Sequence, residues 1–334
     1  MEFLNNHRKL FSVAFWFFVV LTLFVAVIPA LTNQENNAPL PNAIPLSADA
    51  RAGKDVFIAN GCVACHTQQV RNIDMDKLWG TRPSTAADYA ANTRTDFWRN
   101  TATLMGTERT GPDLTNIGNR QPSQVWNLLH LFQPRAVVAG SIMPAYPWLF
   151  EVKNILDTGD IEIVVPDQFR KGITGKIVAT KEGLQLVAYL QSLKQTPLPD
   201  GTPAPGFLYP KETKGDSTGE TRNAANGKEL YAANCQSCHQ ENGEGLKGAF
   251  PPLKGSLIAT GDSLGLYLTI IMQGYDARPE YAVMPAVGIN NNLTPEEITA
   301  IINYERTSWG NHARTLSVEE VKKIMESLKP APVQ

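Results

Sequence analysis

The most apolar part of the chain lies close to its beginning. Residues 10–34 contain no charged side chain and are mostly apolar, which matches the ~20 residues that span the hydrocarbon core of a bilayer. A secretory signal peptide is the alternative, but its apolar core runs only ~7–15 residues and precedes a small-x-small cleavage pattern, which is poor around Ile28. We therefore predict that residues 1–35 form a short flank and a retained transmembrane helix.

The charges on either side of this segment predict its orientation. Arg8 and Lys9 precede it, whereas residues 32–42 offer only Glu35. Because positive charge favours the cytoplasmic side, we expect the amino terminus in the cytoplasm and the rest of the chain outside it. This pattern is typical of a single-pass protein of the bacterial inner membrane whose folded part lies on the periplasmic side.

Apolar residues at helical spacing predict three further helices. They cover residues 180–194, 294–305 and 317–328. The second opens with Thr294-Pro295-Glu296-Glu297, which combines a capping box with proline at the first helical position. Polar and apolar residues alternate over 160–165, which predicts a short strand paired with residues 176–180. The fold class is therefore expected to be mainly α.

Length and composition set the domain organisation. A chain of 334 residues exceeds one typical domain. Residues 195–222 are rich in proline and glycine and lack apolar periodicity, so we predict a linker between a domain at 45–194 and a second at 223–330. With 30 Lys+Arg against 32 Asp+Glu, the net charge of −2 excludes a nucleic-acid binder driven by gross basicity.

All four cysteines fall in two Cys-x-x-Cys-His strings, Cys62-Val63-Ala64-Cys65-His66 and Cys235-Gln236-Ser237-Cys238-His239. This is the pattern of c-type haem attachment. One helical turn separates the two thiols, so each can form a thioether with a haem vinyl group, and the histidine that follows presents its imidazole to the iron. We predict two covalently bound haem c groups, attached through Cys62, Cys65, Cys235 and Cys238 and ligated by His66 and His239.

A thioredoxin-like redox pair or half of a zinc site would explain one Cys-x-x-Cys string. The repeat of the histidine and of its context argues against both. Gly53-Lys54 precedes the first string and Gly227-Lys228 the second, with only Gly61 extra in the first copy. This internal repeat indicates two haem domains, each with a helix leading into its site.

Both copies resemble class I cytochrome c domains. The resemblance implies a leading helix, the attachment motif, a proline loop, a methionine loop and a closing helix. It also implies that a proline carbonyl, in Gly111-Pro112-Asp113-Leu114 and in Pro251-Pro252-Leu253, accepts the Nδ1 proton of the haem histidine. Such a bond fixes the imidazole ring and raises its basicity.

The second axial ligand has several candidates, namely Met75, Met105, Met143, Met272 and Met284. Met143 and Met284 each precede a proline, which biases them towards extended loop, and each lies between proline loop and closing helix. Met272 lies in an apolar helical run and fits the core. We predict Met143 and Met284 as ligands, so that neither iron has an open position and each transfers electrons.

Other side chains in the first domain leave alternatives open. His130 competes with Met143 as a ligand, although we favour its interpretation as a packed, hydrogen-bonded histidine. Haem propionates need cationic partners with a forked geometry, and Arg109 beside the proline loop is a candidate. Trp148 either lines the haem crevice or belongs to a docking face.

Longer motifs in the first domain carry a more specific resemblance. They are Cys65-His66-Thr67-Gln68, Trp79-Gly80-Thr81-Arg82-Pro83, Arg109-Thr110-Gly111-Pro112-Asp113-Leu114, Gly118-Asn119-Arg120-Gln121-Pro122-Ser123 and Ser141-Ile142-Met143-Pro144-Ala145-Tyr146-Pro147-Trp148-Leu149. Residues 1–194 resemble the membrane-anchored monohaem subunit II of cbb-type haem-copper cytochrome c oxidases. The resemblance implies Met143 as axial ligand and a polytopic oxidase catalytic subunit as partner.

The second haem domain departs from that family, because its subunit II normally ends near residue 194. Residues 304–311 are instead similar to the ending of cytochrome c domains attached to periplasmic dehydrogenases and reductases. We expect an electron-transfer subunit of a terminal oxidase, itself not the oxygen-reducing enzyme, that receives electrons from a periplasmic donor such as a soluble cytochrome c. A dihaem peroxidase and a free-standing membrane-tethered cytochrome c remain as rival hypotheses.

Overall fold

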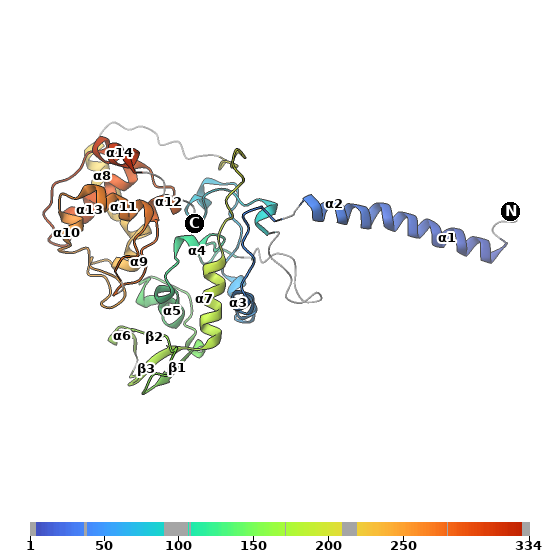
Figure 1. Ribbon diagram of the computed structural model, residues 1–334, viewed down its shortest axis with the longest axis horizontal. Helices are drawn as coiled ribbons and strands as arrows, with labels where there is room; N and C mark the ends of the chain where they lie inside the picture. The colour runs from blue at the N-terminus through green and yellow to red at the C-terminus, as the bar shows by residue number, and fades with distance from the viewer. Residues whose placement is uncertain are drawn as a thin grey trace. The chain divides into compact units, whose positions relative to one another are not determined.

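A computed structural model describes residues 5–36, 39–89, 106, 108–170, 172–208, 219–278 and 280–328. Most of the regular structure is helical (Figure 1). Contacts between Cα atoms divide the chain into two compact units, one containing the amino-terminal helices and the other containing both Cys-x-x-Cys-His motifs. Met105 and Trp98 lie outside the described residues.

The amino-terminal unit carries the predicted transmembrane helix. Helix α1 (His7–Thr22), a π-helical turn (Leu23–Val27) and helix α2 (Ile28–Asn36) follow one another as a single rod (Figure 1). Its apolar span, His7–Thr32, has no buried residue in its most apolar window. The π turn ends two residues before Pro29, which has no backbone N–H to donate to the α-helical ladder.

The first haem motif belongs to a group of short helices and one small sheet. The helices are α3 (Ala48–Ala59), α4 (Ile117–Arg120), α5 (Gln124–Phe132), α6 (Asp167–Arg170) and α7 (Lys181–Ser192). Thr180 accepts a hydrogen bond from Gly183 N–H and caps α7, so the predicted first closing helix is confirmed. Helix α3 packs along α7, and their facing side chains form the core.

The small sheet has the strand order β1-β3-β2 and is antiparallel throughout. Strand β2 (Glu162–Ile163) pairs with β3 (Lys176–Ala179), which confirms the predicted pairing. The sequence did not predict β1 (Phe150–Lys153), which pairs with the other edge of β3 and places Phe150 opposite Ala179.

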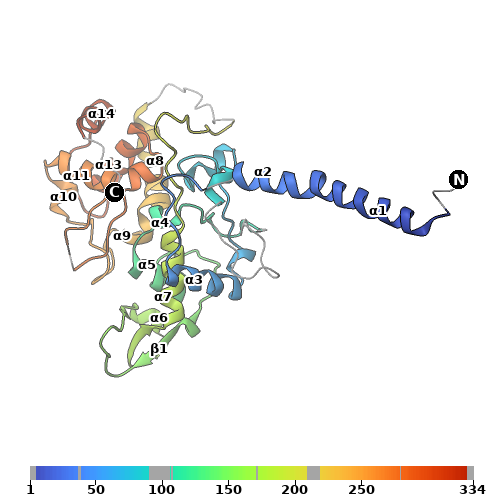
Figure 2. The ribbon, with the colours of Figure 1, turned by 45° about the vertical axis from the view of Figure 1, so that its right-hand side comes forward.

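The second haem motif lies in a group of seven helices: α8 (Gly219–Asn234), α9 (Gln236–His239), α10 (Leu257–Thr260), α11 (Leu264–Gln273), α12 (Val287–Asn290), α13 (Pro295–Thr307) and α14 (Val318–Ser327). Helix α13 packs against α8 and α14, and α14 also packs against α11 (Figure 2). Capping boxes open α13 through Thr294 and Glu297, and α14 through Ser317 and Glu320, as predicted.

The glycine shared by the two copies marks the same helix crossing in each. A Cβ atom at Gly53 in α3 would collide with the Gln185 carbonyl of α7, and one at Gly227 in α8 would collide with the Ala300 carbonyl of α13. One turn later, two aromatic rings meet across each crossing. The ring centroids of Phe57 and Tyr189 are 5.5 Å apart, and those of Tyr231 and Tyr304 are 5.3 Å apart. The internal repeat therefore encodes a close crossing of leading and closing helix in each domain.

Candidate haem-binding sites

Each Cys-x-x-Cys-His motif is one tight turn that follows its leading helix. In the first copy, Cys62 O accepts hydrogen bonds from the N–H groups of Cys65 at 3.2 Å and His66 at 3.0 Å. In the second copy, Cys235 O accepts from Cys238 and His239 at the same distances. Within each motif the two thiols are therefore one turn apart, which is the arrangement that two thioether bonds to one porphyrin require.

The two copies enter this turn differently. The extra residue of the first copy, Gly61, has φ +68° and ends α3 in the left-handed region that glycine favours. In the second copy the turn α9 begins directly after Cys235. The left-handed residue there is Gln240, whose carbonyl accepts a hydrogen bond from the Tyr231 hydroxyl at 2.6 Å.

A proline carbonyl contacts each histidine, as predicted. The Nδ1 of His66 lies 2.8 Å from Pro112 O, and the Nδ1 of His239 lies 2.9 Å from Pro251 O. Because a carbonyl only accepts, Nδ1 must carry the proton and Nε2 keeps its lone pair. Burial lowers the pKa of both histidines, which favours the neutral form that ligates metals.

The first proline loop lies directly against the His66 ring. A Cβ atom at Gly111 would collide with that imidazole, so only glycine allows this approach. Backbone bonds fasten the loop on both sides: Gly111 N–H donates to Cys65 O at 2.9 Å, and Leu114 N–H donates to Thr67 O at 2.8 Å. The attachment turn and the proline loop therefore form one rigid piece.

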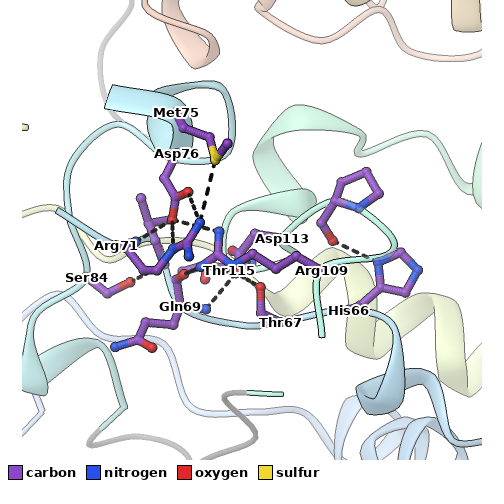
Figure 3. Close-up of polar contacts among 12 residues, drawn as sticks. His66, Thr67, Gln69, Arg71, Met75, Asp76, Ser84, Arg109, Asp113 and Thr115 are labelled. Carbon is purple, nitrogen blue, oxygen red and sulfur yellow. Dashed lines mark hydrogen bonds and ion pairs between the residues drawn. The ribbon is translucent and has the colours of Figure 1, made fainter. Parts of the chain in front are cut away.

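A buried carboxylate, Asp113, fixes this loop from behind (Figure 3). Its Oδ2 accepts from the Thr67 hydroxyl at 2.6 Å and from Gln69 N–H at 2.7 Å, while its Oδ1 accepts from Thr115 N–H at 2.8 Å. Hydrogen bonds to an ionised acceptor are about twice as strong as neutral ones. Asp113 thereby holds the neighbouring Pro112 carbonyl against His66.

A second buried carboxylate, Asp76, binds two arginines (Figure 3). Arg71 donates to it from Nε at 3.1 Å and from one Nη at 3.0 Å, and Arg109 donates at 2.7 Å. Arg109 also lies over the Trp79 ring at 5.1 Å and donates to Gln69 O. These partners occupy the Arg109 guanidinium, so the proposed propionate role of Arg109 is wrong.

Asn311 has the corresponding role in the second site. Its Oδ1 accepts from Gly255 N–H at 2.8 Å, and its Nδ2 donates to Leu253 O at 3.2 Å. This buried amide ties the end of the closing segment to the loop that carries Pro251. Asp113 and Asn311 both belong to motifs that the sequence singles out, but the sequence did not predict their role. The signal was a polar side chain directly after a proline of the first loop and another shortly after the closing helix of the second domain.

Glu305 is a buried acid beside the second attachment turn. It accepts a hydrogen bond from the Tyr267 hydroxyl and lines the cavity that also contains Cys235 and His239. Burial raises the pKa of Glu305 to about 7. Sequence analysis did not identify this group, because a glutamate in a helix is usually solvated.

The thiols and their surroundings argue against the two rival readings of Cys-x-x-Cys. Burial raises the pKa of Cys62 and of Cys238 to about 11, whereas a dithiol redox pair needs a lowered thiol pKa. Among the described residues, no cluster of three or more His, Cys, Asp or Glu side chains could hold a metal ion. Neither a thioredoxin-like pair nor a zinc site fits this geometry.

Both predicted methionine ligands line one cavity, and His66 and His239 line the same cavity. Met143 N–H donates to Ser141 Oγ at 3.2 Å, and a two-bond backbone bridge to Tyr275 holds Met284. Axial ligation by Met143 and Met284 stays a prediction.

Two competing methionines lie elsewhere. Met75 is 65% exposed, and Met272 packs in the core of the second group of helices, as predicted. The Met272 sulfur packs closely against Gly288, where an added Cβ atom would meet it. Among the described candidates, Met143 and Met284 are therefore the ones that line the cavity shared by the two motifs.

His130 and Trp148 are also placed. The His130 ring stacks on Trp126 at 4.6 Å, and burial lowers its pKa to about 4, as expected for a packed neutral histidine. His130 still lines the cavity, so the contact with Trp126 alone does not decide its role.

Trp148 is 61% exposed and donates from its indole to Asn60 at 2.9 Å. It is absent from the cavity lining, which favours a surface role.

Two family models match separate parts of the chain. The family model described as "Cytochrome C oxidase, mono-heme subunit/FixO" matches residues 1–169, about half of the chain. The family model for cytochrome c matches residues 224–309. Each match contains one Cys-x-x-Cys-His motif.

Similar curated proteins match shorter stretches. Cytochrome c-552 of Thermus thermophilus is 33% identical over 111 residues, which is 30% of this chain and 84% of that protein. The cytochrome c subunit of alcohol dehydrogenase (quinone) from Gluconobacter oxydans is 32% identical over 110 residues, 31% of this chain and 23% of that subunit. The cbb3-type cytochrome c oxidase subunit FixP of Azorhizobium caulinodans is 34% identical over 104 residues, 30% of this chain and 33% of FixP. The chain therefore spans a third or less of the dehydrogenase and oxidase subunits that it matches.

Proposed function

Because the chain belongs to the family of the mono-haem subunit of cytochrome c oxidase, we propose that it is a dihaem electron-transfer subunit of a cbb-type terminal oxidase. One observation carries the proposal: two Cys-x-x-Cys-His turns each place a histidine against a proline carbonyl at 2.8–2.9 Å. That arrangement leaves one Nε2 lone pair for iron in each site.

The residues present fit a covalently bound haem c in each domain. Cys62 and Cys65 would hold the first porphyrin, and Cys235 and Cys238 the second. The glycine at 111, which leaves room beside the His66 ring, supports this fit on the histidine side. When bound, each haem supplies a one-electron couple.

The protein side chains set how each couple behaves. The proline carbonyls orient both imidazoles and raise their basicity. Methionine sulfur from Met143 and Met284 would close the other face of each iron and raise the reduction potential. With both faces closed, the chain transfers electrons and leaves oxygen reduction to another subunit.

The proposal includes partners and an order of transfer. Residues 223–330, holding one haem, would receive electrons from a periplasmic donor, for example a soluble cytochrome c, and residues 45–194, holding the other, would deliver them to a polytopic catalytic subunit. The tether supports this order, because residues 1–35 hold the first domain at the membrane and residues 195–222 link it to the second. The haem domains lie on the periplasmic side of the bacterial inner membrane, as the flanking charges favour.

Purification of the tagged chain from native membranes tests the proposal. We expect two haems per chain, both low-spin at rest, and a co-purifying polytopic haem-copper subunit. Fewer than two covalently bound haems, or a resting high-spin haem, would refute the dihaem electron-transfer role. Reduction of the Cys62/Cys65 haem first in rapid kinetics with donor would reverse the order of transfer.

A second candidate is a cytochrome subunit of a quinone-linked dehydrogenase. The similarity to the Gluconobacter oxydans subunit favours it. So does the similarity of residues 304–311 to the ending of cytochrome c domains attached to periplasmic dehydrogenases and reductases. In that case the same purification yields a dehydrogenase subunit in place of the haem-copper subunit.

A further inference from the structure

Helix α13 carries a carboxyl group on a face that is otherwise apolar. Ile298, Ile301 and Ile302 form that buried face, and Glu305 follows them at the next helical repeat, with only 3% of its surface exposed. Glu305 lines the cavity shared by the two motifs, together with Ile301 and Cys235. An acidic side chain therefore stands beside the space that the second porphyrin would fill.

No cation balances this carboxyl group. Within the described part of the chain, no lysine, arginine or histidine forms a salt bridge with Glu305. The guanidinium of the adjacent Arg306 donates instead to the backbone carbonyls of Ala259, Gly261 and Arg314. Burial without a cation disfavours the ionised form of a carboxyl group, so Glu305 can hold a proton near neutral pH, where an exposed glutamate cannot.

The titratable and charged groups near Glu305 come from α8, the attachment turn, α11 and α13. They are Tyr231, Cys235, Tyr267 and Arg306. The Tyr267 hydroxyl donates to Glu305, whereas the Tyr231 hydroxyl is engaged with Gln240 O at 2.6 Å. The Cys235 thiol also donates to Glu305, but a thioether has no S–H, so haem attachment would remove this donor. Burial already raises the pKa of Glu305 to about 7, and loss of a donor to the carboxylate favours the protonated form further.

We propose that Glu305 is a proton-binding site coupled to the redox state of the second haem: it releases its proton when that haem is oxidised and binds one when the haem is reduced. This inference rests on the proposed haem at Cys235 and Cys238. Oxidation adds one positive charge to the iron porphyrin, which favours the carboxylate. The electron leaves to the first haem and the proton leaves to water, so the net charge of the buried site stays constant. A unit charge in a poorly solvated interior shifts a neighbouring equilibrium by about tenfold.

The test is a redox titration of the detergent-solubilised full chain at several pH values between about 5 and about 9, with the two waves assigned by Met143→Ala and Met284→Ala variants. In the wild type, the reduction equilibrium of the second haem should weaken about tenfold as pH rises, about 59 mV for a one-electron couple, because ionised Glu305 stabilises the oxidised form. In Glu305→Gln most of this fall should disappear, so that its second potential lies above that of the wild type at high pH and equals it at low pH. Glu296→Gln, which changes an exposed glutamate of the same helix, is the matched control and should keep the whole fall.

Two outcomes would overturn the proposal while both haems stay attached: a second potential that falls equally in the wild type and in Glu305→Gln, or a fall that disappears equally in the Glu296 control. Absence of the second haem from the wild-type chain would instead refute the proposed function. Should Glu305→Gln fail to fold, Tyr267→Phe removes the hydroxyl that donates to the carboxylate. This change should raise the pKa of Glu305 and move the fall in potential to higher pH, and a fall that stays at the wild-type pH would also overturn the proposal.

Discussion

Replacing Asp113 with asparagine removes a buried charged acceptor that fastens the first proline loop. Asparagine keeps the size but offers one oxygen, so either the two bonds to Oδ2 or the single bond to Oδ1 are lost. The orientation of the asparagine side chain that loses less free energy keeps the two bonds to Oδ2 and gives up the bond from Thr115 N–H. A hydrogen bond to a charged group contributes about 1.5–3 kcal/mol, so we expect a loss of about 2–3 kcal/mol in the free energy of unfolding of this domain.

Unfolding of the solubilised full chain by guanidinium chloride, monitored through the visible absorption of the first haem, measures this loss. Asp55→Asn, an exposed aspartate on α3, is the matched control because it removes the same charge without a buried bond. The Asp113 variant should unfold at a clearly lower denaturant concentration, and its first reduction potential should rise, because a negative charge in a poorly solvated place near the haem is lost. Stability within about 0.5 kcal/mol of the control would refute the anchoring role of Asp113.

Three further changes have defined outcomes. Met143→Ala should open one iron position, so that the first haem becomes high-spin at rest and binds cyanide; a purely low-spin spectrum would exclude Met143 as ligand. Gly227→Val should abolish the α8–α13 crossing and prevent recovery of the second haem, whereas Gly206→Val, in open space, should leave the haem content unchanged. Glu305→Gln should remove a pH dependence of stability. The raised pKa means that the folded state keeps its proton between about pH 4.5 and 7 while the unfolded state releases it, so wild-type stability falls as pH rises through that window, by about 3 kcal/mol. A denaturation profile equally steep in both chains would show that another group is responsible.

The sequence predicted the parts of the fold that depend on local chemistry. Capping residues and proline at the first helical position fixed the start of α13, and the transmembrane helix followed from an uncharged apolar run. The contacts of Pro112 and Pro251 with the two histidines were anticipated through family resemblance, and the structure confirms them.

Other features depend on residues far apart in sequence and were not predictable from local pattern. Strand β1 has no alternation that distinguishes it from loop, and it forms only because β3 offers an edge. The roles of Asp76 and Asp113 require knowledge of which donors surround them after folding. Arg109 and Arg120 look equivalent in sequence, and only their partners separate them: Arg109 donates to the Asp76 carboxylate, whereas Arg120 donates to the backbone carbonyl of Asp113.

The two iron sites are predicted to have the same pair of ligands, yet the groups behind the histidines differ in charge. Behind His66 the loop is held by ionised Asp113 within a network of arginines, whereas behind His239 a neutral amide, Asn311, does the same work. Fixed charges in a poorly solvated interior act directly on the energy of adding an electron. Equal coordination spheres can therefore differ in driving force, and a duplicated domain can impose a direction on electron flow without any change of ligand.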